Sequence, residues 1–205
     1  MFVLGITGGV GAGKSMVLTH LKEKYSAYVL EADALAKRLM EPGEPLFDAV
    51  VSAFGEEILT DGAIDRQRMA GLVFSDADKL ECLNAIVHPG VKKYILRDIE
   101  EKKTDGHVKL YVIEAALLIQ DGYDEICDEL WYIHADEDTR VARIMESRGY
   151  SKERCEGMLK SQPDAAYFQV HTACTIDNSR DFSDTAAQIR KRLNLIGKSG
   201  IMSYV

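Results

Sequence analysis

Short apolar runs alternate along this chain with longer stretches of helical, amphipathic pattern. The runs lack the apolar and polar alternation of a strand that faces water on one side, so they indicate strands buried on both faces. Short buried strands separated by helices fold into right-handed βαβ units. The chain therefore predicts an α/β fold, a three-layer α/β/α arrangement with a parallel sheet. Its strands are expected at Phe2–Thr7, Tyr28–Ala32, Leu110–Glu114, Leu130–His134 and Thr175–Asp177.

Two segments interrupt this alternation. Residues 34–106 have helical patterning and few strand signals, and a loop of that length without structure is uncommon in a compact domain. We expect a helical insertion there, and a second, shorter insertion at 140–168 that is polar and basic in its first part. The core then comprises residues 1–33, 107–139 and 169–205. Residues 197–205 are expected to be a loosely held tail.

The charge balance narrows the range of partners. The chain has 25 Lys and Arg residues against 33 Asp and Glu, a net charge of -8, whereas general nucleic-acid and anionic-membrane surfaces bind through Lys and Arg. No apolar run approaches the length that spans a bilayer, and the N-terminus has a strand pattern instead of a signal sequence. We expect a cytoplasmic protein, a monomer or weak homo-oligomer, with no nucleic-acid or membrane partner.

The cysteines are expected to be free thiols, most of them buried. They are widely spaced and form no C-x-x-C pair, which argues against a zinc site and a disulfide framework. Intracellular redox conditions also favour free thiols. The four positions are Cys82, Cys127, Cys155 and Cys174.

A glycine-rich segment joins the first predicted strand to the first predicted helix. Residues 8–15 read GGVGAGKS and fit G-x-x-x-x-G-K-[ST] in the strand-to-helix context of a P-loop. The glycines let consecutive backbone N–H groups curve around a phosphate at a helix N-terminus. Lys14 supplies a charge for the β and γ phosphates, and Ser15 a hydroxyl ligand for Mg²⁺. The segment predicts a nucleoside triphosphate site.

Two other interpretations of the segment fit less well. A tight turn without a ligand does not need the Lys-Ser pair as well as the glycines. A dinucleotide pattern, G-x-G-x-x-G, starts at Gly9 and continues at Gly11, but Lys14 stands at the third glycine position.

The missing motifs narrow the class of nucleotide-using protein. A GTPase switch needs D-x-x-G, and no Asp in the chain has Gly three residues on. Guanine recognition by N-K-x-D is also missing, since residues 178–181 read NSRD. The chain is short for a motor ATPase. A small P-loop protein with two insertions is typical of a small-molecule kinase, where one insertion holds the acceptor and the other closes over ATP to exclude water.

Two carboxylates follow the second predicted strand. Glu31 and Asp33 stand at its carboxyl end, the edge where open α/β sheets bind ligands. A carboxylate across from the γ-phosphate accepts a proton from an acceptor hydroxyl. Asp33 fits a second role equally well, the capping of the helix that follows it. The chemistry alone leaves both roles open.

Segments along nearly the whole chain, from Val3 to about Leu193, resemble the dephospho-CoA kinase family. They are GITGGVGAGKS, EADALAKRLMEPGEP, FGEEILTDGAIDRQRMAGLVF, LNAIVHPGV and TIDNS. The P-loop is generic, whereas the D-A-D-like strand end, the D-G-x-x-D-R segment and the H-P pair are distinctive. The resemblance implies phosphorylation of the ribose 3′-hydroxyl of dephospho-CoA by ATP and Mg²⁺, the last step of CoA synthesis. It also implies a fold like that of nucleotide monophosphate kinases, with 34–106 as the acceptor-binding domain and 140–168 as the lid.

The resemblance further implies roles for particular residues. Asp33 matches the family's proposed general base, and Lys14 and Arg143 are expected to act on the transferred phosphoryl group. ATP contacts are expected at Gly9, Gly11, Ala12, Gly13, Lys14, Ser15, Met16 and Asn178; metal contacts at Ser15 and Glu114; and dephospho-CoA contacts at Asp33, Arg66, His88, Gln162 and Arg148.

Several of these positions have a plainer interpretation. Arg66 fits a helix-surface ion pair as well as a contact with an acceptor phosphate. His88, before Pro89, fits a structural role at a helix break as well as a binding role. Arg143 and Arg148 fit ion pairs on a solvated helix.

Two parts of the chain depart from the family pattern. Arg140 stands where many relatives have Gln, so we leave it outside the expected site. The third strand continues D-x-P-L-L-x-E in many relatives, and this chain has EAALLIQ, so Glu114 keeps the first acid, Ala116 replaces Pro and Gln120 replaces the last acid. A role that the family's carboxylate plays at this position therefore does not transfer to Gln120.

Two other functions stay open on the sequence alone. Another small-molecule kinase of this fold, such as one acting on a nucleoside monophosphate, would have the same P-loop. A nucleotide-dependent binding protein without turnover would also have it, although such a protein has no special use for Asp33.

Overall fold

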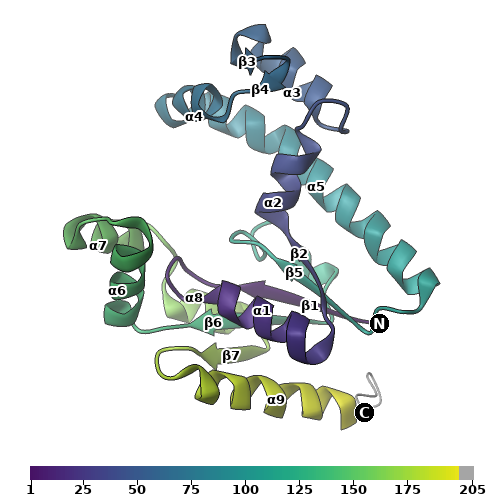
Figure 1. Cartoon of the computed structure of the whole chain (residues 1–205), viewed down its shortest axis with the longest axis vertical. Helices are drawn as coiled ribbons and strands as arrows, with labels where there is room; N and C mark the ends of the chain where they lie inside the picture. The colour runs from purple at the N-terminus through teal and green to yellow at the C-terminus, as the bar shows by residue number, and fades with distance from the viewer. Residues whose placement is uncertain (199–205) are drawn as a thin grey trace. The chain divides into compact units, whose positions relative to one another are not determined.

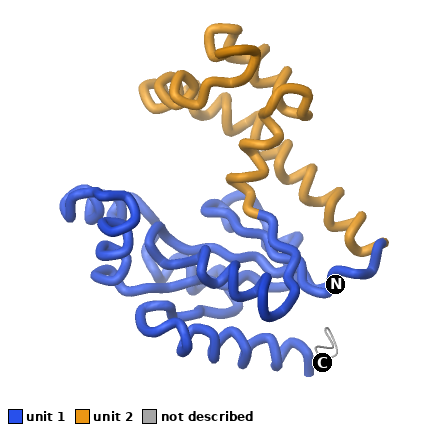
Figure 2. Tube along the Cα trace, in the orientation of Figure 1, with its two compact units in different colours: residues 1–30, 105–205 blue, residues 31–104 orange. Residues whose placement is uncertain are grey.

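The computed structural model describes residues 1–198 and divides into two compact units (Figure 2). Unit 1 comprises residues 1–30 and 105–205, and unit 2 comprises residues 31–104. The sequence places the long insertion at 34–106. Residues 140–168 belong to the same unit as the sheet, so their role as a lid stays a prediction.

Unit 1 is a parallel sheet with helices packed on it. Five strands lie in the order β2-β5-β1-β6-β7 (Figure 1), and β1 is parallel to both β5 and β6. All six residues of β1 are buried, which explains the lack of polar alternation in its sequence. The elements are β1 (Phe2–Thr7), α1 (Lys14–Tyr25), β2 (Tyr28–Glu31), β5 (Leu110–Glu114), a 3-10 turn (Tyr123–Glu125), β6 (Glu129–His134), α6 (Glu137–Arg148), α7 (Lys152–Lys160), α8 (Ala165–His171), β7 (Cys174–Asp177) and α9 (Phe182–Lys198).

The predicted α/β fold and its five strands are confirmed, with changes at the strand ends. Ala32 begins a helix instead of ending β2, and β6 and β7 begin one residue earlier than expected, at Glu129 and Cys174. Gly197 and Lys198 form the end of α9 rather than part of a tail, and 199–205 lie outside the described residues.

Helices pack on both faces of the sheet. Alternate residues of β1 (Phe2, Leu4 and Ile6) share one buried cluster with residues of α1 and α9. On the other face, the ring of Tyr132 in β6 stacks on Phe168 of α8, with centroids 4.7 Å apart and planes inclined by 7°. Successive side chains of a strand point to opposite faces, so each strand contributes to both layers.

Unit 2 is helical with one short hairpin. Its elements are α2 (Ala32–Leu39), α3 (Phe47–Phe54), a 3-10 turn (Glu56–Ile58), β3 (Leu59–Thr60), β4 (Ala63–Ile64), α4 (Arg66–Ser75) and α5 (Ala77–Asp105). The hairpin strands have two residues each, too few to produce a strand signal in the sequence. Asp61 and Gly62 form its turn, with φ values of 52° and 78°, as the two-residue type I′ turn requires.

Helix α5 passes through Pro89, so the helix break that the sequence offers at His88 and Pro89 is wrong. Proline removes one backbone N–H and disfavours a helix interior. Close packing at the next residue explains why the helix continues. A Cβ at Gly90 would overlap the side chain of Leu46, and tertiary contacts of this kind stabilise a helix more than local propensity does.

The cysteines are free, as predicted, but fewer are buried than expected. Cys155 is buried, Cys127 and Cys174 are half-buried, and Cys82 is exposed. Burial raises the pKa of the Cys127 thiol to about 12, so this thiol stays protonated at neutral pH.

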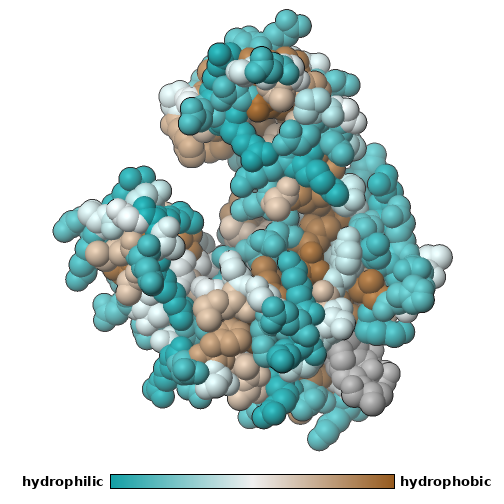
Figure 3. Space-filling model, viewed as in Figure 1, coloured by the Kyte–Doolittle hydropathy of each residue, from teal (hydrophilic) through white to brown (hydrophobic). Residues whose placement is uncertain are grey.

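The surface is largely hydrophilic. In the view of Figure 3, hydrophilic residues cover most of the outer surface of each unit. Within residues 1–198, no helix is both long enough and apolar enough to cross a membrane.

Candidate functional site

The P-loop joins β1 to α1 in unit 1. The chain leaves the carboxyl end of β1 next to β5, where Ile6 is paired with Glu114, and α1 begins at Lys14. Gly11 and Gly13 have φ values of 79° and 83°, in the left-handed region that favours glycine. These two glycines therefore allow the backbone of the loop to curve.

The loop leaves several backbone donors free. The N–H groups of Gly11, Gly13, Lys14 and Ser15 donate no hydrogen bond to any atom of residues 1–198. The last two lie in the first turn of α1, where N–H groups have no acceptor within the helix and the helix dipole is positive. Such an arrangement of free donors suits an anion, phosphate above all.

Lys14 and Glu114 form an ion pair beside the loop. The ammonium of Lys14 donates to the carbonyl of Gly8 over 2.9 Å and lies 3.5 Å from Oε1 of Glu114. The two side chains are only 17% and 13% exposed, so both charges are largely shielded from water and gain from the ion pair. The structure thus brings together the residue predicted for the phosphates and the residue predicted for the metal.

Asn178 binds the carbonyl side of the loop. Its Nδ2 donates to the carbonyl of Ala12 over 2.8 Å, and its Oδ1 accepts from the Thr185 hydroxyl over 2.9 Å. Asn178 and Thr185 are completely buried, and a Cβ at Gly13 would overlap Nδ2. The sequence predicts a nucleotide contact for Asn178. The structure engages both ends of the buried amide within the protein, and the nucleotide contact stays a prediction.

The buried pair of Asn178 and Thr185 is expected to stabilise unit 1. Thr185→Val keeps the shape of the side chain and removes the hydroxyl, so Oδ1 of Asn178 loses its donor. We expect the free energy of unfolding to fall by about 1 to 3 kcal/mol, the cost of an unsatisfied buried polar group. Urea denaturation measures the change. Thr175→Val, at an exposed position of β7, is the control, and equal losses in both variants would contradict the assignment.

Arg143 also lies on the carbonyl side of the loop. Its Nη2 donates to the carbonyl of Asn178 over 2.9 Å, and Nη1 lies 3.5 Å and 3.4 Å from the carbonyls of Gly11 and Ala12. These contacts hold the loop, and a contact of Arg143 with the transferred phosphoryl group stays a prediction. Arg148 is exposed in the last turn of α6, and its substrate contact also stays a prediction.

Arg140 is the site residue that sequence reasoning missed. Its Nε donates to the carbonyl of Val10 over 2.9 Å, and its Nη2 donates to Oε1 of Gln162 over 2.6 Å. The same Oε1 accepts the N–H of Val10 over 3.1 Å. The available signal was the three-residue spacing from Arg143, which places both arginines on one face of α6.

Oxygen donors for a metal ion come from α1 and β5. The Ser15 residue is exposed in the first turn of α1, followed by Met16, which is 46% exposed, and Glu114 ends β5. No group of three or more His, Cys, Asp or Glu side chains suited to a metal ion occurs in the described part of the chain. A hydroxyl and a carboxylate without a protein cage match the way Mg²⁺ is bound, largely through phosphates and water.

Asp33 lies in the first turn of α2, in unit 2. The residue at the N-cap position is Glu31, and it makes no side-chain capping hydrogen bond. Asp33 therefore does not cap the helix, and that interpretation of the sequence is wrong. The exposed carboxylate of Asp33 makes no hydrogen bond or ion pair with any residue from 1 to 198. It is available to accept a proton.

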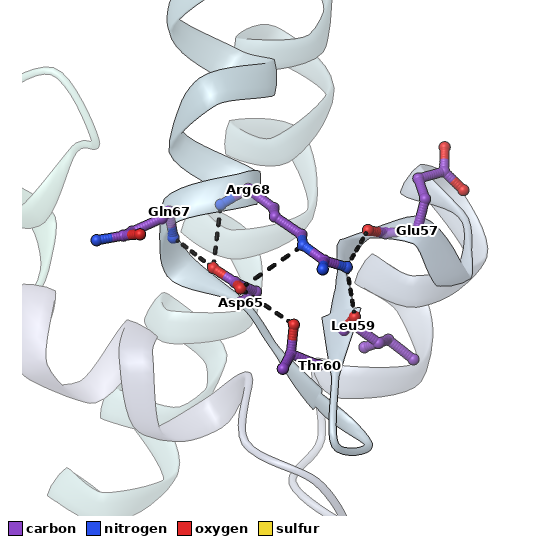
Figure 4. Close-up of polar contacts among 6 residues, drawn as sticks. All are labelled: Glu57, Leu59, Thr60, Asp65, Gln67 and Arg68. Carbon is purple, nitrogen blue, oxygen red and sulfur yellow. Dashed lines mark hydrogen bonds and ion pairs between the residues drawn. The ribbon is translucent and has the colours of Figure 1, made fainter.

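The D-G-x-x-D-R segment forms a polar network in unit 2 (Figure 4). The carboxylate of Asp65 caps α4, accepting from the N–H groups of Gln67 and Arg68 at 2.9 Å and 3.1 Å and from the Thr60 hydroxyl at 3.1 Å. Arg68 in turn donates to the carbonyl of Leu59 over 2.9 Å. The hydrogen bond from the Arg68 N–H contributes most to lowering the pKa of Asp65. The network attaches the hairpin to α4.

Arg66 takes part in an exposed ion pair. Its Nη2 lies 2.8 Å from Oε1 of Glu41, and the two side chains are 65% and 50% exposed. Such pairs add little stability. The ion pair that the sequence offers as an alternative is present, and a substrate contact of Arg66 stays a prediction. The same holds for His88, which is half-buried on α5.

Comparisons with known proteins give one consistent result. The sequence model of the family "Dephospho-CoA kinase" matches residues 2–184. Dephospho-CoA kinase of Symbiobacterium thermophilum is 34% identical over 190 residues, 92% of this chain and 79% of that protein. The enzyme of Geobacter sulfurreducens is 34% identical over 197 residues, 96% of this chain and 97% of that protein. The crystal structure of TT1252 from Thermus thermophilus superposes with a TM-score of 0.77 at 27% identity, over 95% of this chain and 97% of that one.

Proposed function

The chain belongs to the dephospho-CoA kinase family, and we propose how its residues carry out the reaction of that family. The reaction is the ATP-dependent phosphorylation of dephospho-CoA in CoA biosynthesis. The ribose 3′-hydroxyl oxygen bonds to the γ-phosphorus of ATP, and the bond from that phosphorus to the β,γ-bridging oxygen breaks. ADP leaves, and the hydroxyl proton passes to a base.

The observation that supports this proposal is that the N–H groups and the carbonyl groups of the P-loop differ in their hydrogen bonding. The N–H groups of Gly11, Gly13, Lys14 and Ser15 donate to no atom of the described residues. The carbonyl groups at Val10 and Ala12, in contrast, accept hydrogen bonds from Arg140 and Asn178. The free donors bind the phosphates of ATP. Gly9, Ala12 and Met16 complete the expected contacts along the loop and the first turn of α1. The Lys14 ammonium compensates the charge that develops on the β,γ-bridging oxygen.

Ser15 and Glu114 are the residues that would hold Mg²⁺. Kinases use a divalent metal with ATP, and when bound it neutralises charge on the phosphate oxygens. The hydroxyl and carboxylate oxygens suit a hard cation that keeps several waters. Glu114 has a second partner in Lys14, 3.5 Å away, so the acid orients the ammonium as well.

Asp33 is the base that accepts the proton of the acceptor hydroxyl. Its carboxylate is exposed and makes no hydrogen bond or ion pair within residues 1–198, which leaves it free to accept a proton. Unit 2 is the acceptor-binding part, with Arg66 and His88 as contacts to dephospho-CoA. Residues 140–168 act as a lid that excludes water, and Arg148 and Gln162 contact the substrate from it. A cytoplasmic monomer or weak homo-oligomer stays a prediction.

A coupled ADP-release assay tests the function. The purified protein with ATP, Mg²⁺ and dephospho-CoA is expected to release ADP and form CoA in equal amounts, with CoA identified by mass spectrometry. Nucleoside monophosphates are the comparison acceptors, and with them only slow ATP hydrolysis is expected. Turnover of a nucleoside monophosphate instead would point to another kinase of this fold. Tight ATP binding without turnover of any acceptor would point to a binding protein.

A further inference from the structure

Two glycines of the P-loop face protein atoms at short range. A Cβ at Gly9 would overlap Nη2 of Arg140 and lie 2.7 Å from Oε1 of Gln162. A Cβ at Gly11 would lie 2.7 Å from the backbone oxygen of Arg140. Cβ atoms do not approach other atoms this closely. Position 11 therefore needs glycine because of the backbone of Arg140, whereas a Cβ at position 9 would displace the ends of the Arg140 and Gln162 side chains. The sequence pattern alone attributes these glycines to the approach of a phosphate.

Arg140 and Gln162 enclose the residue between these glycines. The Val10 carbonyl accepts from Nε of Arg140, the Arg140 Nη2 donates to Oε1 of Gln162, and that oxygen accepts the Val10 N–H, with lengths of 2.9, 2.6 and 3.1 Å. These bonds close a ring of three residues, which we name the Val10 ring. Both backbone polar groups of Val10 are therefore satisfied by side chains from segment 140–168.

The side chain of Val10 is held as well. It packs against a buried cluster in α6 and α7 that contains Val141, Ile144, Cys155 and Leu159. Val10 is thus attached to segment 140–168 through its N–H, its carbonyl and its side chain. Any displacement of this segment must move Val10 or break these contacts.

The charge of Arg140 is not compensated within the ring. The guanidinium has no carboxylate within ion-pair distance among residues 1–198, and its ring partners are neutral oxygens. Burial lowers the pKa of Arg140, but a guanidinium stays charged at neutral pH. The loop that binds a polyanion therefore has a fixed positive charge on its outer side.

We propose that Arg140 and Gln162 are positioning residues that fix the peptide groups of Val10 and so set the nucleotide-binding shape of the P-loop. Segment 140–168 passes its position to the loop through this residue, in addition to the contacts of Arg143 with Gly11 and Ala12. The inference rests on the proposed function for its kinetic part, and direct nucleotide binding tests it separately.

Five variants and one control test the Val10 ring. Arg140→Met and Gln162→Leu each break it, and each is expected to raise the dissociation constant of a nonhydrolysable ATP analogue about tenfold. Because both remove the same ring, the double variant is expected to show about the same tenfold loss rather than the product of the two. Arg140→Lys keeps the charge but loses the planar fork, so it is expected to bind as weakly as Arg140→Met. Gln162→Glu keeps an oxygen that accepts both donors, so it is expected to bind the analogue more tightly than Gln162→Leu.

The control is Arg154→Met. Arg154 belongs to the same segment, but its guanidinium lies over the Tyr150 ring, 3.8 Å from the ring centroid. Its binding constant is expected to be unchanged. Isothermal titration measures binding, circular dichroism verifies folding, and ADP release gives KM and kcat.

Three outcomes would overturn the proposal. Losses that multiply in the double variant, or full affinity in Gln162→Leu, would show that Arg140 and Gln162 do not act through one ring. A lowered Tm with unchanged ATP affinity would show that the ring only stabilises the fold. Absence of turnover in the wild-type protein would contradict the proposed function. The binding constants of the variants would then test the Val10 ring by themselves.

Discussion

Asp33→Asn is expected to lower kcat by about a thousandfold, within the range that a positioned general base contributes. The amide keeps the size of the side chain and cannot take up the proton of the acceptor hydroxyl. Asp33 belongs to unit 2 and has no hydrogen bond or ion pair with the described residues, so its replacement leaves the nucleotide contacts in place. We therefore expect the dissociation constant for ATP to change by less than about threefold.

Steady-state ADP release with saturating dephospho-CoA and titration with an ATP analogue measure these two effects. The matched control is Asp48→Asn, since Asp48 is an exposed acid in the first turn of another helix of unit 2, α3. It is expected to retain full activity. Equal losses of turnover and of ATP affinity in Asp33→Asn would remove Asp33 from the role of base.

Lys14→Met is expected to lower kcat/KM for ATP by about a thousandfold, the scale of removing one strong donor from a phosphoryl or oxyanion site. Both kcat and ATP affinity are expected to fall, because the ammonium binds the phosphates in the ground state and compensates more charge in the transition state. A second effect adds to the loss. Glu114, 3.5 Å from the ammonium and 13% exposed, would lose this ion pair and keep its negative charge beside the triphosphate.

Lys24→Met is the control that tests whether the position of the lost charge matters. Lys24 lies exposed in the last turn of the same helix, so its replacement removes an equal charge far along α1 from the loop. Unchanged kinetics are expected for Lys24→Met. Full activity of Lys14→Met would refute the P-loop interpretation of residues 8–15.

The strands and the P-loop were predictable because their signals are local. Six consecutive buried residues in β1 produce an apolar run that any reader of the sequence can find. The P-loop combines strand, glycines, Lys14 and Ser15 within a few residues, and the φ values of Gly11 and Gly13 confirm the need for glycine there. The β3–β4 hairpin escaped prediction because two residues are too few to form a periodic pattern.

Roles that depend on distant contacts were not predictable. Asn178 is buried with Thr185 and holds Ala12, 166 positions away in the chain, a contact that no local pattern predicts. The sequence leaves Arg140 outside the expected site, and the Arg140 side chain contacts Val10, 130 positions away. The helix break at Pro89 is absent because the packing of Gly90 on Leu46 overrides local preference.

The sequence by itself determined that this chain is a P-loop α/β protein with a helical insertion, and its segments identified the family. Apolar periodicity, turn chemistry and short motifs are properties of neighbouring residues, and they act before any long-range contact forms. Only the tertiary structure decided what surrounds the loop. The side chains of Arg140, Gln162 and Asn178 form hydrogen bonds with the loop across more than 100 residues of chain. Such pairings depend on how the sheet and helices pack, which no local pattern records.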